Sequence, residues 1–318
     1  MSVNPEPPVA TPGAQPGAVT EAEILSQPRV WQQAVEAHRD AARRLLVAPG
    51  ERVLFLGCGT SAFVARALAA LREQAGMGES HWAYASELPP LRGAGARDYD
   101  RVVALTRSGT TTEVLQALAA VPSATRRVAL SAVHGSPVEP LVEDTLVIDV
   151  ADEASVVQTR FPTTTLLLAR AALGEDVLPV IEETAATLQA AAVVADPSRF
   201  RQFAFLGRGW AVGLADEAAL KLRESAQAWS EAYPALDYRH GPIAVASADS
   251  LVWIMGTPPP GLIAQIEATG ATTISTRADP LVDLVSIHRL ALGLARARGL
   301  DPDHPRHLTR SVVLTGGA

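Results

Sequence analysis

The sequence predicts an α/β protein built on doubly wound parallel sheets and divided into two similar units. Its 318 residues exceed what a single hydrophobic core usually organises, so two domains are the default expectation. Short apolar runs alternate with amphipathic helical stretches, which favours parallel strands joined by crossover helices. A strand, a Gly-x-Gly turn and a helix occur once in each half, at Gly57–Gly59 and at Gly207–Gly209, and this repetition indicates a duplicated unit.

The composition is that of a globular protein with enough apolar material to form buried cores. Apolar residues make up 48% of the chain and charged residues 19%, which rules out disorder over its whole length. The net charge is −7, with no basic excess to hold a polyanion, so we expect no nucleic-acid partner. The single cysteine, Cys58, excludes an internal disulfide framework and a cysteine-rich zinc site. The longest apolar runs, such as 251–255, are too short to span a bilayer, so we expect no membrane association and a cytoplasmic location.

The first half of the chain is predicted to form one domain, over residues 21–195. Residues 1–20 are rich in Pro, Ala and Gly and lack the basic start and apolar core of a signal peptide, so we expect a disordered tail. An amphipathic helix over 21–46 follows, and buried strands then alternate with helices. The predicted strands cover 52–56, a run that ends at 85–87, then 101–106, 127–130 and 146–150, and a long helical zone covers 163–195.

The second half restarts the same pattern and is predicted to form a domain over residues 196–318. Its elements are a strand at 203–206, a helix that continues to Trp229, strands at 251–255 and 272–275, and a helix over 280–298. The polar and aromatic character of residues 230–242 predicts a long connection after the first helix. This connection presents His240 directly before Gly241-Pro242.

Three hydroxyl-rich loops follow predicted strands, at 57–61, 106–111 and 155–160. In parallel sheets, ligands bind at the carboxyl ends of the strands, where the N-termini of helices offer unpaired N–H groups. A phosphate monoester needs several hydrogen-bond donors around its oxygens and little side-chain bulk, and these loops supply both. In any one loop the hydroxyls are equally typical of helix N-caps, but three such loops at equivalent ends of one sheet favour a phosphate site.

The first of these loops also fits a relaxed dinucleotide-binding pattern, Gly57-x-Gly59-x-x-Ala62. Glu87, at the end of the next predicted strand, would then bind a ribose. A nicotinamide-dependent oxidoreductase is therefore an alternative. However, a dinucleotide site needs no second hydroxyl-rich loop such as 106–111, and no later motif resembles a hydride-transfer centre.

The first helix of the second half carries one charged face. Glu217, Lys221 and Glu224 recur at helical spacing on the side opposite an apolar stripe that ends at Trp229, and Lys221 is the only lysine in the sequence. On spacing alone, a solvent-exposed face with a Glu–Lys pair is the favoured interpretation. A carboxylate and the imidazole of His240 near a phosphate pocket would instead suit proton transfer at neutral pH, although a single loop histidine is more often a surface residue.

Several motifs, taken in order, carry a resemblance to a known family. In the first half they are Gly57-Cys-Gly-Thr-Ser61, Ala85-Ser-Glu87, Arg107-Ser-Gly-Thr-Thr-Thr-Glu113 and Ser155-Val-Val-Gln-Thr-Arg160. In the second half they are Gly207-Arg-Gly209, Glu217-Ala-Ala-Leu-Lys-Leu-Arg-Glu224, Glu231-Ala-Tyr-Pro234, Arg239-His-Gly-Pro242 and the C-terminal segment 299–308. Over residues 21–318 the chain resembles the double-SIS (sugar isomerase) phosphosugar enzymes. It is similar to the isomerase half of glucosamine-6-phosphate synthase and to the stand-alone amino-sugar-phosphate deaminases and isomerases.

The resemblance implies two tandem flavodoxin-like αβα domains with parallel sheets, a homodimer, and neither a metal ion nor another cofactor. It assigns the phosphate of a small phosphosugar to the following residues, the last two through their backbone: Ser61, Thr106, Arg107, Ser108, Thr111, Val156 and Val157. Other substrate-site residues that it implies are Thr60, Glu217, Lys221 and Arg310. Glu224 would move a proton between C1 and C2 of the sugar, and His240 would open the ring, entering the site of the neighbouring subunit.

Two departures from the synthases decide the expected reaction. No glutaminase domain precedes residue 21, so we expect no glutamine-dependent amination. Arg310 occupies the position at which the synthases carry an imine-forming lysine, and a guanidinium, which stays protonated, is a poor imine former. Lys221 does not replace that lysine, because the family places this residue on the helix rather than in the closing tail.

We therefore expect an aldose–ketose isomerase or deaminase that acts on an amino-sugar phosphate without forming an imine with the enzyme. The substrate would resemble glucosamine 6-phosphate, and the products would be fructose 6-phosphate and ammonia. The alternative is a non-catalytic phosphosugar-binding sensor or regulator. Such a protein would need only the phosphate loops, whereas Glu224 and His240 are both present.

Overall fold

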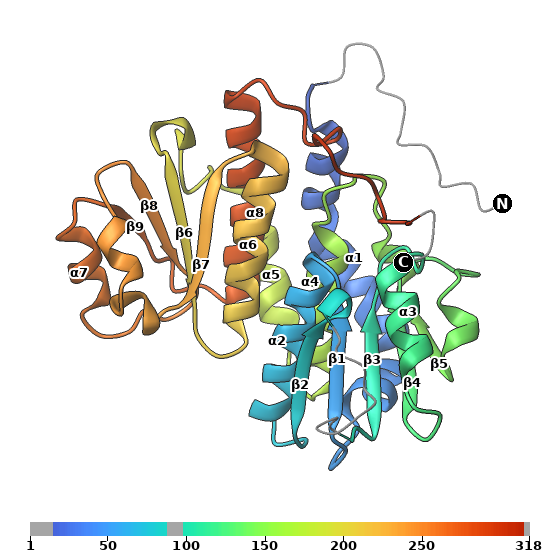
Figure 1. The fold of residues 1–318 in the computed structure, drawn as a ribbon. Coiled ribbons are helices and arrows are strands. Elements are labelled where there is room, and N and C mark those ends of the chain that lie inside the picture. Colours follow the sequence, from blue (N-terminus) through green and yellow to red (C-terminus); the bar gives the residue numbers. More distant parts are fainter. Residues whose placement is uncertain (1–14, 88–97, 315–318) are drawn as a thin grey trace.

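The computed structural model describes residues 15–87 and 98–314, which form two sheets and the helices that cover them (Figure 1). The strand order is β2-β1-β3-β4-β5 in the first sheet and β7-β6-β8-β9 in the second. Every strand pair in the described residues is parallel. The first order is that of flavodoxin-like folds, and the second sheet repeats it without a fifth strand. The predicted α/β fold with two tandem flavodoxin-like units is therefore confirmed.

The first sheet is covered by helices on both faces, and all residues of its two central strands, β1 and β3, are buried. Its strands are β1 (Val53–Gly57), β2 (Ser80–Tyr84), β3 (Arg101–Leu105), β4 (Arg126–Ser131) and β5 (Asp144–Val147). The helices are α1 (Ala18–Ala42), which continues as a π-helical turn over Arg43–Val47, α2 (Thr60–Gln74), α3 (Thr112–Ala120) and α4 (Arg160–Ala172). Single 3₁₀ turns lie at Ala85–Glu87, Glu139–Leu141 and Asp149–Ala151.

The second unit begins after a connecting helix, α5 (Leu178–Gln189), and a 3₁₀ turn at Pro197–Arg199. Its strands are β6 (Gln202–Gly207), β7 (Trp229–Pro234), β8 (Ser250–Ile254) and β9 (Thr272–Ile274). Its helices are α6 (Ala211–Ala226), α7 (Leu262–Glu267) and α8 (Pro280–Ala297), with 3₁₀ turns at Asp237–Arg239 and Pro242–Val245. None of the helices in the described residues is long and apolar enough to cross a lipid bilayer.

Several predicted boundaries were wrong. The first helix begins at Ala18 rather than residue 21, and residues 1–14 of the predicted tail lie outside the described residues. The strand predicted to end at 85–87 stops at Tyr84. The helical zone predicted over 163–195 is two helices, α4 and α5, separated by a turn at which Gly174 has a φ of +98°.

The prediction for residues 226–234 was also wrong. Helix α6 ends at Ala226 because Gln227 adopts the left-handed conformation, so the predicted apolar stripe does not reach Trp229. Trp229 instead begins β7, an edge strand of the second sheet, and 73% of this residue is exposed. Part of the predicted connection over 230–242 is therefore a strand, which pairs with β6 as far as Pro234.

The two units share a tightly packed junction. Figure 1 shows α6 and α8 between the two sheets, and one buried apolar core extends from Phe55 in β1 to Phe203 in β6. Arg66 on α2 forms an ion pair with Asp216 on α6 at 2.6 Å. Gly213 lets the two helices approach closely, because a Cβ at this position would lie 2.5 Å from the carbonyl oxygen of residue 63.

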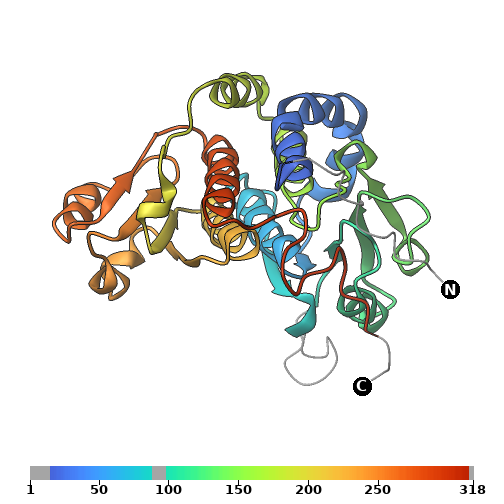
Figure 2. The same ribbon diagram turned by 90° about the horizontal axis from the view of Figure 1, so that it is seen from above.

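The C-terminal segment returns from α8 to the first unit, as both ribbon views show (Figures 1 and 2). The amide of Thr112, at the start of α3, donates to the carbonyl of Val312 at 3.1 Å. The amide of Leu314 donates to the hydroxyl of Thr112 at 2.9 Å. Residues 312–314 therefore lie beside the loop that joins β3 to α3.

Replacing Gly213 by alanine should destabilise the junction between the units. The new Cβ would lie 2.5 Å from the carbonyl oxygen of Phe63 and 2.9 Å from the amide nitrogen of Ala67. The helices must then move apart, which we expect to cost about 1–3 kcal/mol. The matched control is Gly293→Ala in α8, where the nearest atom is 4.0 Å away and no such cost is expected. Thermal unfolding measures the stability of both variants. An unchanged Tm for Gly213→Ala would contradict the close approach of α2 and α6.

Candidate active site

The turn between β1 and α2 forms an open loop at the N-terminus of a helix. β1 and β3 flank the switch point of the first sheet, which is where ligands bind in such folds. A Cβ at Gly57 would lie 2.6 Å from the backbone of Ser61, so only glycine lets α2 begin directly behind the strand. Gly59 has a φ of +53°, and no described atom lies within 4 Å of the position of its absent Cβ. The loop therefore faces open space, with the buried residues Thr60 and Ser61 beside it.

The equivalent turn of the second unit is filled. Gly209 also has a positive φ, of +56°, but the side-chain amide nitrogen of Gln74 lies 2.3 Å from the position of its absent Cβ. Trp210 and Ala211 follow this turn where Thr60 and Ser61 follow the first. The second turn has neither the open space nor the hydroxyls of the first, so only the first is suited to a phosphate.

The loop after β3 contains buried polar atoms that have no partner among the described residues. The hydroxyl of Thr106 and the Nε atom of Arg107 are both buried without a hydrogen bond. Ser108 Oγ lies 2.8 Å from Thr110 Oγ1, and Thr111 is the N-cap residue of α3. Burial lowers the pKa of Arg107, whose guanidinium remains a cation because its pKa starts far above neutrality. A buried guanidinium and a free hydroxyl, in a loop that leads to a helix N-terminus, are groups that stabilise an anion.

The third predicted loop is held in place mainly by two buried carboxylates. Glu153 accepts hydrogen bonds from the amides of residues 159, 160 and 161 at 2.6, 2.8 and 3.1 Å, and thereby caps α4. Glu23 of α1 accepts from the amide of Ala154 at 2.6 Å and from the hydroxyl of Ser155. The Ser155 hydroxyl is therefore engaged in holding the loop. Val157 is buried and Val156 half-buried, so this loop offers backbone rather than free hydroxyls.

Arg107 connects the second and third loops to the C-terminal segment. Its Nη1 atom donates to the carbonyl of Ser155 at 2.8 Å, and its Nη2 atom donates to the carbonyl of Arg310 at 2.9 Å. The guanidinium of Arg310 donates to Asp152 Oδ1 at 2.5 Å and to the carbonyl of Glu153. Arg310 therefore anchors the segment to the third loop.

Ser311 places the C-terminal segment directly on the second hydroxyl loop. Thr110 Oγ1 donates to Ser311 Oγ at 2.8 Å, and Thr111 Oγ1 lies 3.4 Å from the same oxygen. Hydroxyls from residues 108, 110, 111 and 311 are thus brought together.

The charged face of α6 is buried, so the predicted solvent-exposed face was wrong. Glu217 is 2% exposed and Lys221 1% exposed, because this face packs against α2. Lys221 Nζ lies 2.6 Å from Glu224 Oε2 and 3.4 Å from Glu217 Oε1. It also donates to the hydroxyl of Thr60 at 3.1 Å. Thr60 is the neighbour of Ser61, so the cluster lies directly beside the open loop.

Burial sets the charge states in this cluster. It raises the pKa of Glu217 to about 7, although the nearby ammonium of Lys221 opposes the shift. Burial acts to lower the pKa of Lys221, but Glu217 and Glu224 outweigh it and the pKa is raised. Lys221 therefore stays protonated at neutral pH. Glu217 Oε2 is buried without a hydrogen bond in the described residues and is available to a ligand or a water molecule.

Sequence reasoning missed a buried histidine behind this cluster. His288 of α8 is 2% exposed, and burial together with the charge of Lys221 lowers its pKa to about 3, so the ring is neutral. A ring nitrogen lies 3.5 Å from the side-chain amide of Gln27 in α1. The sequence did not indicate this contact, because His288 lies in a largely apolar helix that is far from Gln27 along the chain.

The structure of one chain does not bring His240 to Glu224. His240 follows β7 and is exposed, at the edge of the second sheet where Pro234 pairs with Gly207 and α6 begins. Glu224 lies in the last turn of α6, thirteen residues after Ala211. With a rise of 1.5 Å per residue, this separates the two ends of the helix by about 20 Å.

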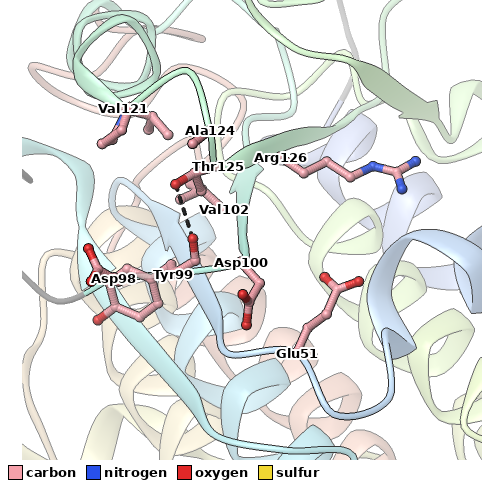
Figure 3. A pocket seen from close by; sticks show the side chains of 10 residues that line it. Glu51, Asp98, Tyr99, Asp100, Val102, Val121, Ala124, Thr125 and Arg126 are labelled. Carbon is pink, nitrogen blue, oxygen red and sulfur yellow. Dashed lines mark hydrogen bonds between the residues drawn. The ribbon is translucent and has the colours of Figure 1, made fainter.

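A cavity of about 540 Å³ lies away from these loops, at the amino ends of the strands of the first sheet (Figure 3). Glu51, Asp98 and Asp100 line it, and Arg126, the one basic residue in its wall, is paired with Asp144 at 2.5 Å. Three carboxylates would repel a phosphate. A second cavity, of about 420 Å³, includes Glu224 in its wall. Among the described residues, no group of three or more His, Cys, Asp and Glu side chains is arranged to hold a metal ion.

Glu23→Gln should change how stability depends on pH. Burial, together with the charge of Glu153, raises the pKa of Glu23 to about 7, above its unfolded value. The native state therefore favours the protonated carboxyl, and the stability that Glu23 contributes is lost as pH rises through 7. Urea unfolding of both proteins at pH 5 and pH 8 measures the effect: wild type should lose stability relative to Glu23→Gln at pH 8. The control is Glu36→Gln, at an exposed position on the same helix. If wild type and Glu23→Gln differ in unfolding free energy by the same amount at pH 5 and pH 8, the raised pKa is contradicted.

Comparisons with known proteins identify relatives of the chain by sequence. No protein-family model matches the chain. A glutamine–fructose-6-phosphate aminotransferase (isomerizing) of Pyrobaculum aerophilum is 31% identical over 266 residues, which cover 68% of this chain and 44% of that protein. The chain spans about half the length of the curated relatives it matches.

Solved structures share the fold. A glucosamine-6-phosphate deaminase of Thermotoga maritima superimposes with a TM-score of 0.76 at 24% identity, covering 93% of this chain and all of that one. A tagatose-6-phosphate ketose/aldose isomerase of Escherichia coli gives a TM-score of 0.74 at 17% identity, covering 95% and 99%. By sequence similarity, motif order and fold, the chain belongs to the double-SIS family of phosphosugar enzymes.

Proposed function

We propose that this protein is an amino-sugar-phosphate deaminase or isomerase. The observation that carries the proposal is the cluster of the buried Glu217 and Lys221 with the half-buried Glu224. This cluster is hydrogen-bonded to Thr60 beside the open loop. A phosphate loop and a proton-transfer group are thus adjacent. The named relatives act on fructose 6-phosphate or glucosamine 6-phosphate, or carry out ketose/aldose isomerisation, which favours this reading over a dinucleotide enzyme.

The phosphate would be held by the first two hydroxyl loops of the first unit. Ser61 lies at the N-terminus of α2, and the Thr106 hydroxyl is buried and free to donate. The helix N-terminus and the guanidinium of Arg107 favour the negative charge of the monoester. Ser108 and Thr111 would complete the set of donors, with the backbone of Val156 and Val157 beside them.

Glu224 would be the base that moves a proton between C1 and C2. Lys221 Nζ donates a hydrogen bond to Glu224 Oε2 at 2.6 Å and so fixes one oxygen of this carboxyl group. The other carboxylate oxygen is then free to approach the sugar. Glu217, with a pKa raised to about 7, can hold a second proton close by at neutral pH.

The reaction needs no imine with the enzyme, because a 2-amino-2-deoxy sugar phosphate carries its own nitrogen. Glu224 takes the proton from C2 of the open-chain aldehyde, which gives an enolamine. Returning the proton to C1 gives a ketimine at C2, and addition of water releases ammonia and leaves fructose 6-phosphate. A substrate with a hydroxyl at C2 would pass through an enediol instead and would only be isomerised.

His240 would open the sugar ring from a neighbouring subunit. It lies at the end of α6 opposite to Glu224, so one chain alone does not supply both groups to one site. We therefore propose a homodimer in which the exposed His240 of each subunit enters the site of the other.

Glu224→Gln should abolish turnover of glucosamine 6-phosphate, lowering kcat by about a thousandfold or more, because the amide cannot accept the C2 proton. Binding of the phosphosugar should persist, since the phosphate loops are unchanged. Coupled assays of ammonia and fructose 6-phosphate measure turnover, and thermal-shift titration measures binding. The exposed Glu182→Gln on α5 is the matched control. Equal turnover by Glu224→Gln would reject the base assignment.

The same assay separates the enzyme from a sensor. If the wild-type protein is stabilised by phosphosugars but releases no product from any hexosamine phosphate, the non-catalytic sensor is the better description.

Mixing two inactive variants tests whether His240 acts across a dimer interface. Co-expression of His240→Asn with Glu224→Gln gives hybrid dimers in which one of the two sites contains both intact residues. Random pairing should restore about a quarter of the wild-type sites. Ammonia release by the purified mixture measures the recovery, with each variant alone as the background. No recovery in dimers that are shown to be hybrid would mean that His240 does not act in the partner's site.

A further inference from the structure

The cavity of about 420 Å³ beside Glu224 is distinct from the phosphate loops. It lies between the last turn of α6 and the C-terminal segment. Its lining residues are Leu220, Arg223, Glu224, Gln227, Ala228, Arg306, His307 and Leu308. Glu224 is thus shared between this cavity and the cluster that leads to Thr60, and the proposed reacting carbons would lie at the mouth of the cavity.

The charge of this cavity is unusual for a chain with a net charge of −7. Arg223 and Arg306 bring two guanidinium groups to it, and His307 brings an imidazole. Arg223 donates to the backbone carbonyl of Ser230 at 2.8 Å and is in no ion pair among the residues that the structure describes. Arg306 and His307 form no ion pair within the described residues. The one carboxylate in the wall, Glu224, is already paired with Lys221 at 2.6 Å.

The backbone of this wall is also strained. Gln227 and His307 have φ values of 50° and 64°, and they are two of four non-glycine residues with positive φ in the described ranges. Such conformations occur preferentially at binding and active sites, where the surrounding structure maintains them. Here they hold the end of α6 and the C-terminal segment in the positions that form the cavity.

We propose that this cavity binds a short carboxylate-bearing group attached to the nitrogen of an amino-sugar phosphate. The inference rests on the proposed function, because it places C1 and C2 at Glu224. With the phosphate held in the first unit, a substituent on the nitrogen extends away from the phosphate loops and into the cavity. Arginine matches a carboxylate with paired hydrogen bonds, and Leu220, Ala228 and Leu308 provide apolar contacts for the linking carbons.

The substituent changes the product but not the proton transfer. Glu224 moves the proton from C2 to C1, which places the double bond between C2 and the substituted nitrogen. Water adds to C2, and the C–N bond breaks. The products are fructose 6-phosphate and an amine that carries the carboxylate, in place of ammonia.

The test compares two ligands that differ only in charge: N-(carboxymethyl)glucosamine 6-phosphate and its neutral amide, N-(carbamoylmethyl)glucosamine 6-phosphate. Binding is measured by titration calorimetry in the Glu224→Gln background, so that neither ligand is consumed. We expect the carboxylate to bind about tenfold more tightly than the amide. Arg306→Gln should reduce this preference to about twofold or less. Arg201→Gln, at a highly exposed arginine outside the cavity, is the matched control and should keep it.

The outcomes separate this inference from the proposed function. Equal affinity for the two ligands, or a preference that survives both Arg306→Gln and His307→Gln, would overturn the carboxylate subsite even if the wild-type enzyme deaminates glucosamine 6-phosphate. A charge preference that depends on Arg306 supports the subsite even if no product forms, in which case only the proposed reaction fails. His307→Gln also provides the second variant if Arg306→Gln does not fold.

Discussion

A lysine ammonium can be buried only where its charge is neutralised, and the junction of this protein is arranged around that requirement. Lys221 is surrounded by Glu217, Glu224 and the hydroxyl of Thr60, so its partners come from both units. Docking of the units takes this charge out of water, which is costly unless the carboxylates and the hydroxyl compensate for it. The close approach of α2 and α6 at Gly213 and the position of the cluster of Glu217, Lys221 and Glu224 are therefore parts of one constraint.

Duplication gave this protein two similar units but one site. Counted from Gly57 and Gly207, Lys221 and Glu224 of α6 correspond to Leu71 and Gln74 of α2. At these two positions α2 therefore presents an apolar residue and an amide to the second unit. Helix α6 presents an ammonium and a carboxylate to the first unit. Gln74 fills the space beside Gly209, whereas the space beside Gly59 is open. The charged cluster of α6 thus lies beside the open turn of the first unit and not beside the filled turn of the second.

Local patterns predicted every strand except β7, as well as the two sheets and the hydroxyl loops, because strand periodicity and Gly-x-Gly turns are properties of short segments. Burial of the charged face of α6 was not predictable in this way. Spacing identifies residues that share a face, but it does not reveal that Thr60 and α2 cover that face. The sequence did not indicate where α6 ends, because this depends on the left-handed conformation of Gln227. It did not indicate β7 either, because this edge strand contains polar residues. The contacts of Glu23 and His288 depend on tertiary packing alone.

The single lysine has a practical consequence. Lys221 is 1% exposed, so the folded protein presents no lysine side chain to solvent. Reagents that acylate or crosslink primary amines will not modify a side chain of the native state. They can reach this amine only after α6 has moved away from α2, so acylation at this one position reports how often the two halves come apart.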